Sequence, residues 1–333
     1  MRILAGDIGG TKTRLAVFEI SKQRWPIVLA EESYHSVRYD SLDTLVSRFL
    51  DGFDGECRIA SFGIAGPIKS GRCKTTNLPW TVDAHRLALE QGFERVYLIN
   101  DLEANGWGIA GLNEKDFFVL NSGDPQARGN AAVIAAGTGL GEAGMYWDGR
   151  QHHPFATEGG HTDFSPGDVL ETALLEYLAK RFQHVSWERV LSGPGLVNVY
   201  QFLSEYRRLE SPTWLQEELH SNDAAAAISR AGLAGRCSLC SQALDLFVHL
   251  YGVEAGNLAL KVMATGGIYI GGGIAPKIME RLKGPNFMIA FMAKGRMQPL
   301  LEAMPVKLIL NDRTALLGPA LCAARRVLKC KTE

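Results

Sequence analysis

Short apolar runs that end in glycine or polar turns alternate with amphipathic stretches along the first third of the chain. The apolar runs predict strands at residues 2–7, 13–20, 58–65 and 95–99. The amphipathic stretches, whose apolar residues recur at helical spacing, predict helices at 41–52 and 82–91. The resulting order, strand–strand–helix–strand–helix–strand, is typical of an α/β domain.

The second half of the chain repeats this opening layout. Residues 131–147 read as an apolar strand, a glycine turn containing a threonine, and a second apolar strand. Residues 3–18 have the same arrangement. Two glycine-turn hairpins at corresponding places are less easily produced by chance than one, and they predict two related halves.

The rest of the chain is rich in helix signals. Predicted helices cover 168–182, a segment opening at Ser192-Gly193-Pro194, the run 238–263 and a final helix from about 314. Residues 266–276 predict a strand and a glycine-rich turn into a helix with Pro276 in its first turn, and residues 306–310 predict another strand. The segment 203–236 is the least distinctive, and we expect it to be helical.

Composition excludes several classes of protein. The 333 residues are 46% hydrophobic and 21% charged, and 35 basic against 36 acidic residues give a net charge of -1. This balance provides no general attraction to nucleic acid or to an anionic membrane. No apolar run reaches the roughly 20 residues that span a bilayer, and Asp7 interrupts the N-terminus before a signal sequence could form.

The cysteines are too sparse to form a disulfide framework, so we expect a reducing, cytoplasmic location. They are Cys57, Cys73, Cys237, Cys240, Cys322 and Cys330. Cys237 and Cys240 form a lone CxxC without the further cysteine or histidine ligands that a structural zinc site needs. We therefore interpret them as residues at the start of a helix.

The first glycine turn, Asp7-Ile8-Gly9-Gly10-Thr11, has the chemistry of a phosphate site. Small residues let backbone N–H groups approach phosphate oxygens, and the Thr11 hydroxyl adds a donor. Asp7 can hold Mg²⁺ there, directly or through water. The GxxxxGK[ST] motif of a P-loop is absent, and the turn is not a dinucleotide fingerprint because it opens a strand and not a helix. Taken alone, it is equally consistent with a tight hairpin that carries a solvated aspartate.

Two further glycine clusters extend this pattern. The turn made by Gly137, Thr138, Gly139, Leu140 and Gly141 has the same chemistry without a carboxylate. Two facing turns of this kind would clamp a polyphosphate from both sides. The third cluster, Gly271, Gly272 and Gly273, could let an adenosine lie flat on backbone, although such a run is often only a loop.

These motifs, in this order, resemble the bacterial glucokinase family. The resemblance is carried by DIGGT at 7–11, IND at 99–101, GTGLG at 137–141, EGGH at 158–161, ERVLSGPGLVN at 188–198 and GGIYIGGGI at 266–274. It covers nearly the whole chain. The family belongs to the superfamily of hexokinases, actin and heat-shock chaperone ATPases, so the resemblance implies two α/β domains with a duplicated ribonuclease-H-like core.

The resemblance implies that Asp101 is the catalytic base beside the hexose 6-hydroxyl. Asp101 follows a strand of an α/β domain, at the carboxyl end where ligands bind. In phosphoryl transfer the protein mainly positions reactants, while a carboxylate orients the hydroxyl and accepts its proton. The alternative is that Asp101 caps the following helix, since Asn-Asp is a common helix start.

The resemblance also assigns sugar-binding positions. Asn100, Glu158, His161 and Glu188 match the main ones, and Gly66, Pro67 and Asn77 match loops on the substrate side. One amide, two carboxylates and one imidazole suit sugar hydroxyls, which both donate and accept hydrogen bonds. These residues lack the HExxH spacing of a metal site. A cysteine-rich zinc motif, frequent in the related repressor–kinase family, is not found after His161.

The sequence therefore predicts a glucokinase that binds ATP, Mg²⁺ and glucose, with a smaller domain of residues 1–111 and 313–333 and a larger domain of 112–312. Family resemblance suggests a homodimer, and neither nucleic acid nor membrane is expected as a partner. A kinase for another hexose or with another phosphoryl donor remains open, because sugar choice depends on a few hydrogen bonds. A sugar-sensing regulator would need a DNA-binding segment before the strand that starts at Ile3. A chaperone-like ATPase is a more distant alternative.

Overall fold

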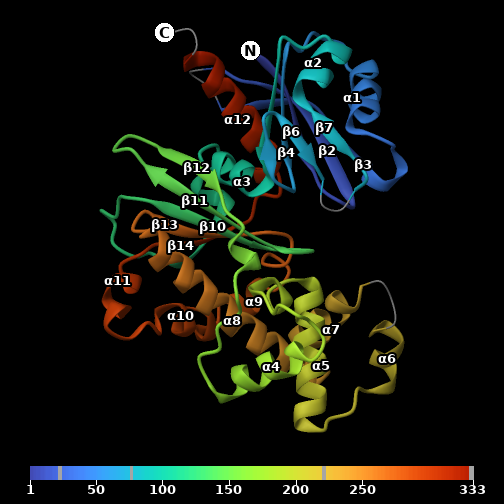
Figure 1. Ribbon diagram of the computed structural model, residues 1–333. Coiled ribbons are helices and arrows are strands. Elements are labelled where there is room, and N and C mark those ends of the chain that lie inside the picture. The colour runs from blue at the N-terminus through green and yellow to red at the C-terminus, as the bar shows by residue number, and fades with distance from the viewer. Residues whose placement is uncertain (22–24, 76–77, 220–222, 330–333) are drawn as a thin grey trace. The chain divides into compact units, whose positions relative to one another are not determined.

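The computed structural model describes residues 1–21, 25–75, 78–219 and 223–329 (Figure 1). The chain divides into two compact units. The first comprises Met1–Asp116, His153–Ala156 and Asn311–Glu333, and the second comprises Phe117–His152 and Thr157–Leu310. Compactness does not establish that a unit folds alone, so the domain boundaries expected from the sequence stay a prediction.

The first unit is built on a five-stranded sheet with the order β3-β2-β1-β4-β8. Its strands are β1 (Arg2–Ile8), β2 (Lys12–Glu19), β3 (Ile27–His35), β4 (Ile59–Ile64) and β8 (Arg95–Asn100). Strands β1, β4 and β8 are parallel, whereas β2 pairs antiparallel with both β1 and β3. Four of these strands were predicted, but β3 was missed because its buried and polar positions do not alternate regularly.

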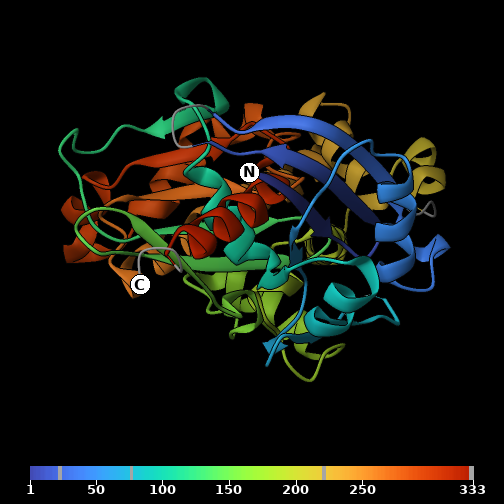
Figure 2. The same ribbon diagram turned by 90° about the horizontal axis from the view of Figure 1, so that it is seen from above.

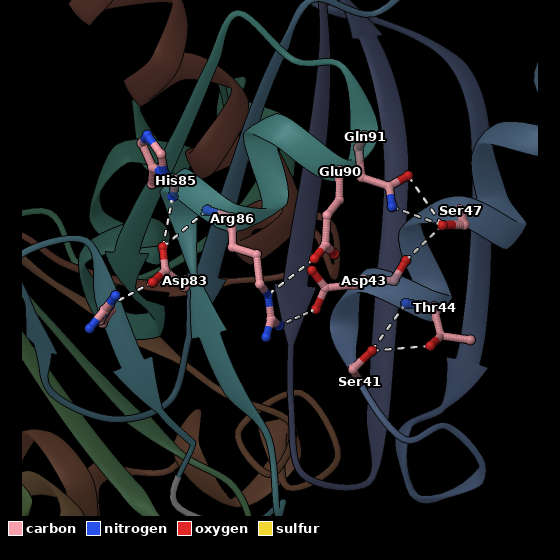
Figure 3. A network of polar contacts seen from close by, with 10 residues as sticks. Ser41, Asp43, Thr44, Ser47, Asp83, His85, Arg86, Glu90 and Gln91 are labelled. Atoms are coloured by element: carbon pink, nitrogen blue, oxygen red, sulfur yellow. Dashed lines mark hydrogen bonds and ion pairs between the residues drawn. The ribbon is translucent and has the colours of Figure 1, made fainter.

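Helices α1 (Leu42–Asp51) and α2 (Ala84–Gln91) begin at polar caps that the sequence makes visible. The Ser41 side chain accepts a hydrogen bond from the Thr44 N–H, and Asp83 accepts from the two N–H groups at the start of α2. Arg86 on α2 reaches Asp43 on α1 at 2.8 Å, which joins the two helices (Figure 3).

The first unit also contains short elements that the sequence did not predict. They are the strands β5 (Ile68–Lys69), β6 (Arg72–Lys74) and β7 (Thr81–Asp83), which form a separate sheet, and the 3₁₀ turns η1 (Ser36–Arg38) and η2 (Glu114–Asp116). Runs of two or three residues are too short for an alternating pattern to be seen.

Helices α3 (Asp101–Ile109) and α12 (Thr314–Lys329) pack closely together, although about two hundred residues separate them in the chain (Figure 2). A Cβ atom placed on Gly318 would lie 1.7 Å from the Ala104 carbonyl oxygen, and one on Gly108 would lie 2.0 Å from the Thr314 carbonyl oxygen. Glycine is therefore required at both positions, because the helix backbones touch there. This contact fixes the helix that begins at Asp101.

The same plan is repeated in a second, six-stranded sheet with the order β12-β11-β10-β13-β14-β9, whose strands other than β12 belong to the second unit. The strands are β9 (Phe117–Asn121), β10 (Ala131–Ala136), β11 (Leu140–Trp147), β12 (His152–Ala156), β13 (Gly267–Gly271) and β14 (Val306–Ile309). Hairpin β10–β11 corresponds to β1–β2, and β10, β13 and β14 are parallel like β1, β4 and β8. The duplication predicted from the two glycine-turn hairpins is thus present.

Helices cover the second sheet and enclose the larger core (Figure 1). They are α4 (Val169–Ala179), α5 (Gly193–Arg207), α6 (Thr213–Leu219), α7 (Ala224–Leu233), α8 (Ser238–Val262), α9 (Met279–Leu282), α10 (Pro285–Met292) and α11 (Gln298–Glu302). The 3₁₀ turn η3 (Gly159–His161) precedes α4, whereas η4 (Trp187–Arg189) lies between α4 and α5 and η5 (Gly295–Met297) between α10 and α11. Fully buried Tyr251 on α8 donates a hydrogen bond toward the carbonyls of β10 and β13.

Two interpretations of helix starts can now be judged. Cys237 caps α8, with its sulfur accepting a hydrogen bond from the Cys240 N–H, as expected of cysteines at a helix start. The prediction for Pro276 was wrong. Residues 272–278 form consecutive turns, and the four-residue helix α9 begins only at Met279. Among the described residues, no helix combines the length and apolar character needed to cross a membrane.

Replacing Gly318 with alanine should lower the unfolding temperature of the protein by about 5 °C or more, since overpacking against backbone costs roughly 3 kcal/mol. Gly92 is the matched control, because a Cβ there meets no atom within 4 Å and only its left-handed backbone is strained. Gly92→Ala should cost about 1 kcal/mol. Calorimetry of both variants checks this, and equal unfolding temperatures would contradict the close contact of α3 and α12.

Candidate active site

In the first unit, two carboxylates lie at the carboxyl ends of parallel strands. Asp7 on β1 is opposite Gly63 on β4, and the next residue of β4 is opposite Asn100 at the end of β8. Asp7 and Asp101 therefore flank Gly63. A side chain at position 63 would collide with Ala104 on α3, since its Cβ would lie 2.9 Å from the Ala104 Cβ.

Asn100, rather than Asp101, caps helix α3. The Asn100 side-chain oxygen accepts hydrogen bonds from the N–H groups of Leu102 at 2.9 Å and Glu103 at 3.3 Å. Asp101 is the first helical residue, and one of its oxygens lies 3.0 Å from the Leu102 N–H. The alternative reading of Asp101 as the cap was therefore wrong. Helix α3 instead holds this half-buried carboxylate at its positive N-terminal end.

Burial and charge together raise the pKa of Asp7. Burial is the larger cause, the Asp101 carboxylate adds to it, and Arg14 and Lys12 oppose it, so that the pKa rises to about 6. The ordinary value is 3.8. A buried carboxylate whose proton affinity is raised partly by a second carboxylate is suited to bind a cation.

The fully buried residue Ser36 forms hydrogen bonds with the backbone of the first glycine turn. The Ser36 hydroxyl donates to the Gly9 carbonyl at 2.7 Å, and its backbone N–H donates to the Thr11 carbonyl at 3.0 Å. The Thr13 hydroxyl lies 2.9 Å from the Ser36 hydroxyl. These bonds occupy inward-facing carbonyls of the turn, while Gly10 and Thr11 remain partly or fully exposed.

In the second unit, Glu188 supports the second glycine turn. Its carboxylate accepts a hydrogen bond from the Leu140 N–H at 3.0 Å. A Cβ on Gly139 would lie 2.4 Å from the same carboxylate oxygen. The turn is closed by a bond from the Gly137 N–H to the Gly139 carbonyl, while Thr138 is exposed. The sequence-predicted sugar residue Glu188 thus also orders the predicted phosphate turn.

Glu158 and His161 bound the 3₁₀ turn η3, and both are exposed. The backbone N–H of His161 donates to the Glu158 carbonyl at 3.0 Å, which closes the turn. The turn packs directly on β11, because a Cβ on Gly160 would lie 2.1 Å from the Leu140 carbonyl oxygen. Glu158, His161 and Glu188 therefore share one neighbourhood around the first residue of β11.

The third glycine cluster lies beside the end of β10. Gly271 is buried as the last residue of β13, whereas Gly272 and Gly273 are exposed. A Cβ on Gly272 would lie 2.3 Å from the Ala136 carbonyl oxygen, and the Ile274 N–H donates to that oxygen at 3.2 Å. The cluster therefore adjoins the second glycine turn, which starts at the next residue.

The predicted residues thus form one group in each unit. The first unit brings together Asp7, Gly9, Gly10, Thr11, Asn100 and Asp101, with Gly66 and Pro67 just beyond the end of β4. The second brings together Gly137, Thr138, Gly139, Gly141, Glu158, His161, Glu188 and the Gly271–Gly273 cluster. Asn77 lies outside the described residues.

Two supporting residues escaped the sequence analysis. Ser36 lies far along the chain from the turn that it holds, and no local motif marks it. Glu142 follows the second glycine turn by one residue and is almost fully buried at 1% exposure, with its carboxylate against Gly159. An acidic residue inside the predicted apolar strand of 131–147 was the available signal.

Comparison with known proteins identifies the family. A sequence model described as glucokinase matches residues 4–326. The chain belongs to the glucokinase family. The glucokinase of Nostoc punctiforme is 46% identical over 337 residues, covering 97% of this chain and 99% of that protein. The glucokinase of Yersinia pestis is 36% identical over 315 residues, covering 95% and 94%.

Solved structures show the same fold. Glucokinase from an Antarctic psychrotroph has a TM-score of 0.85 at 30% identity, covering 97% of this chain and 99% of its own. A glucokinase of the ROK family from Streptomyces griseus, in complex with glucose and AMPPNP, has a TM-score of 0.67 at 19% identity, covering 98% and 100%. The predicted fold class is confirmed: two α/β parts of the ribonuclease-H-like, actin-like ATPase kind.

In the metal-free protein we expect Asp7 to titrate with a pKa near 6. Asp101→Asn should lower that pKa toward the ordinary value of 3.8, because the variant removes one of the two causes that raise it. Titration followed by NMR of carbon-13-labelled aspartate carboxyls measures both values. Asp54→Asn, at an exposed position of the same unit, is the control and should leave the Asp7 pKa unchanged. An unchanged pKa in Asp101→Asn would contradict the electrostatic coupling.

Proposed function

We propose that this protein transfers the γ-phosphoryl group of ATP to the 6-hydroxyl of glucose, producing glucose 6-phosphate and ADP. Family membership supports the reaction, and the observation that carries the mechanism is the position of Asp101. It stands at the carboxyl end of the parallel strands, one strand away from the aspartate of the first glycine turn.

In this mechanism Asp101 is the general base. Its carboxylate orients the sugar hydroxyl and accepts the proton as the oxygen attacks phosphorus. Asn100 caps α3, and Asp101 follows as the first helical residue, at the positive N-terminal end of the helix dipole. Contact between α3 and α12 holds the helix, and therefore the base, in one position.

Asp7 is suited to hold Mg²⁺, directly or through water. Its pKa is raised first by burial and then by the nearby Asp101 carboxylate, and a divalent cation compensates the buried negative charge. When bound, the ion neutralises charge on the polyphosphate. Oxygen ligands such as this carboxylate are those that Mg²⁺ prefers.

The glycine turns are suited to bind ATP. Backbone N–H groups at Gly9, Gly10 and Thr11 would donate to phosphate oxygens, as would those of the second turn at Gly137, Thr138, Gly139 and Gly141. Exposed Gly272 and Gly273 offer side-chain-free backbone for the adenosine.

Sugar recognition is assigned to Asn100, Glu158, His161 and Glu188. Gly66, Pro67 and Asn77 are assigned to the substrate side as well. Exposed Glu158 and His161 offer an acceptor and a ring nitrogen to adjacent sugar hydroxyls. Glu188 uses one oxygen on the Leu140 N–H, which leaves acceptor capacity for a hydroxyl. We also propose a cytoplasmic homodimer.

The variant Asp101→Asn should lower kcat by at least ~10², the usual scale for a positioned base, while glucose still binds. Steady-state kinetics and calorimetric titration with glucose measure the two effects. Asp54→Asn should behave like the wild type, since its side chain is exposed and distant in sequence from every site residue. Near-normal turnover by Asp101→Asn would rule out this base.

ADP release from ATP and Mg²⁺ should depend strongly on glucose. The panel should contain glucose, mannose, fructose, glucosamine, N-acetylglucosamine and no sugar, each with purified protein. Release with another sugar alone would retain the mechanism and change the substrate. Sugar binding without ADP release would contradict the kinase activity and favour a sugar-sensing function. A gel-shift assay with DNA would then test that function.

A further inference from the structure

Two acidic side chains are buried together in the second unit, outside the groups described for catalysis. Glu142 on β11 is 1% exposed, and Glu254 on α8 is fully buried. Glu254 is satisfied: one oxygen accepts from Lys261 at 3.2 Å and the other accepts from Asn257 at 2.8 Å. Among the described residues, no donor reaches the Oε1 atom of Glu142.

This pattern indicates that Glu142 carries a proton. An ionised carboxylate with a buried oxygen that no donor reaches is disfavoured, whereas a carboxylic acid can itself donate to the neighbouring Glu254 carboxylate. Burial, followed by the charge of Glu254, raises the pKa of Glu142 to about 8, and Lys261 opposes the rise. Lys294 lies near the same pair from the end of α10 and binds the Asn257 side chain.

Glu142 also lies directly against the loop that carries Glu158 and His161. Its carbonyl accepts the Thr157 hydroxyl at 2.9 Å, and that hydroxyl accepts the Gly159 N–H at 3.3 Å. A Cβ on Gly159 would lie 2.0 Å from Oε2 of Glu142, so the carboxyl group and the loop backbone are in direct contact.

We propose that Glu142 is a positioning residue for the sugar-binding loop 157–161, with its protonated carboxyl group joining Glu254 on α8 to the backbone of Gly159. This inference rests on the proposed function only for the identity of the sugar. Loss of the proton places two negative charges side by side beneath Gly159. The loop then shifts, and the hydroxyl contacts of Glu158 and His161 are lost.

The charged groups around Glu142 set the direction of this effect. Glu254 and Lys261 on α8 act on it directly, and Lys294 acts on Glu254. Tyr251 on α8 stays neutral, because its burial raises its pKa well above the usual range. Glu142 is therefore neutral at pH 7 and ionised above pH 8, so sugar affinity should fall on the alkaline side.

The test measures KM for the sugar, kcat and hydrogen exchange of residues 157–162 between pH 7 and 9.5, after correction for the intrinsic pH dependence of exchange. In the wild type KM should rise on the order of tenfold, and exchange in the loop should accelerate, with a midpoint near pH 8. Glu142→Gln, which keeps the neutral shape and a donor, should give a flat KM and flat exchange.

Three further variants separate positioning from a general loss of structure. Glu142→Ala should raise KM already at pH 7, because the carboxyl group that contacts the loop is missing. Glu254→Gln should move the alkaline midpoint to lower pH, since Lys261 then favours ionised Glu142. Glu171→Gln is the matched control: Glu171 is equally buried but pairs with His249 at 3.0 Å, and this variant should keep the wild-type midpoint.

Flat wild-type profiles, or Glu142→Gln profiles that follow the wild type, would overturn the positioning role. Absence of sugar phosphorylation at pH 7 would instead refute the proposed function. In that case the exchange data still decide the inference, because they need no substrate.

Discussion

The structure of the first unit depends on holding two like charges close together. Asp7 lies near the end of β1 and Asp101 directly follows β8, on either side of β4, and the pKa of Asp7 is raised by burial and by Asp101. Such a pair costs free energy in the free protein, and a bound cation recovers it. The glycine contacts at positions 63, 108 and 318 are required because α3 must approach both the sheet and α12 for Asp101 to reach this place.

In the second unit, one short segment of β11 contacts both the predicted phosphate turn and the predicted sugar loop. Leu140 lies in the second glycine turn, donates its N–H to Glu188, and has its carbonyl oxygen against Gly160. Two residues later, Glu142 contacts Gly159 and reaches the pair of acidic and basic groups on α8. A displacement of this segment would therefore move the predicted phosphate turn and the predicted sugar loop together, which links the two binding events through one strand.

Local signals predicted much of this arrangement. Caps at Ser41 and Ser192, strands delivering Asp7 and Asp101, and the repeated hairpin were all visible, because each depends on residues adjacent in sequence. Contacts between distant segments were not visible. Ser36 beneath the first turn, Glu142 beneath the loop at 157–161, and α12 against α3 join segments from 15 to about two hundred residues apart. Hydrophobic periodicity does not encode such pairs, and without structure only the unusual Glu142 in an apolar strand hinted at one.

Comparison of the two halves of the duplication shows how the aspartates at corresponding places differ. The sequence Ile99-Asn100-Asp101 after β8 has a counterpart in Leu310-Asn311-Asp312 after β14, and both asparagines accept backbone N–H groups at the start of the next segment. The two aspartates differ in their partners. Asp312 forms a structural pair with Arg14, at 3.3 Å, whereas Asp101 faces Asp7 across β4. The second glycine turn, residues 137–141, contains no carboxylate, so only the first half of the repeat has the acidic pair that we propose for a cation. The two halves therefore share one backbone plan, and the carboxylate of Asp7 distinguishes the half in which we propose the cation site.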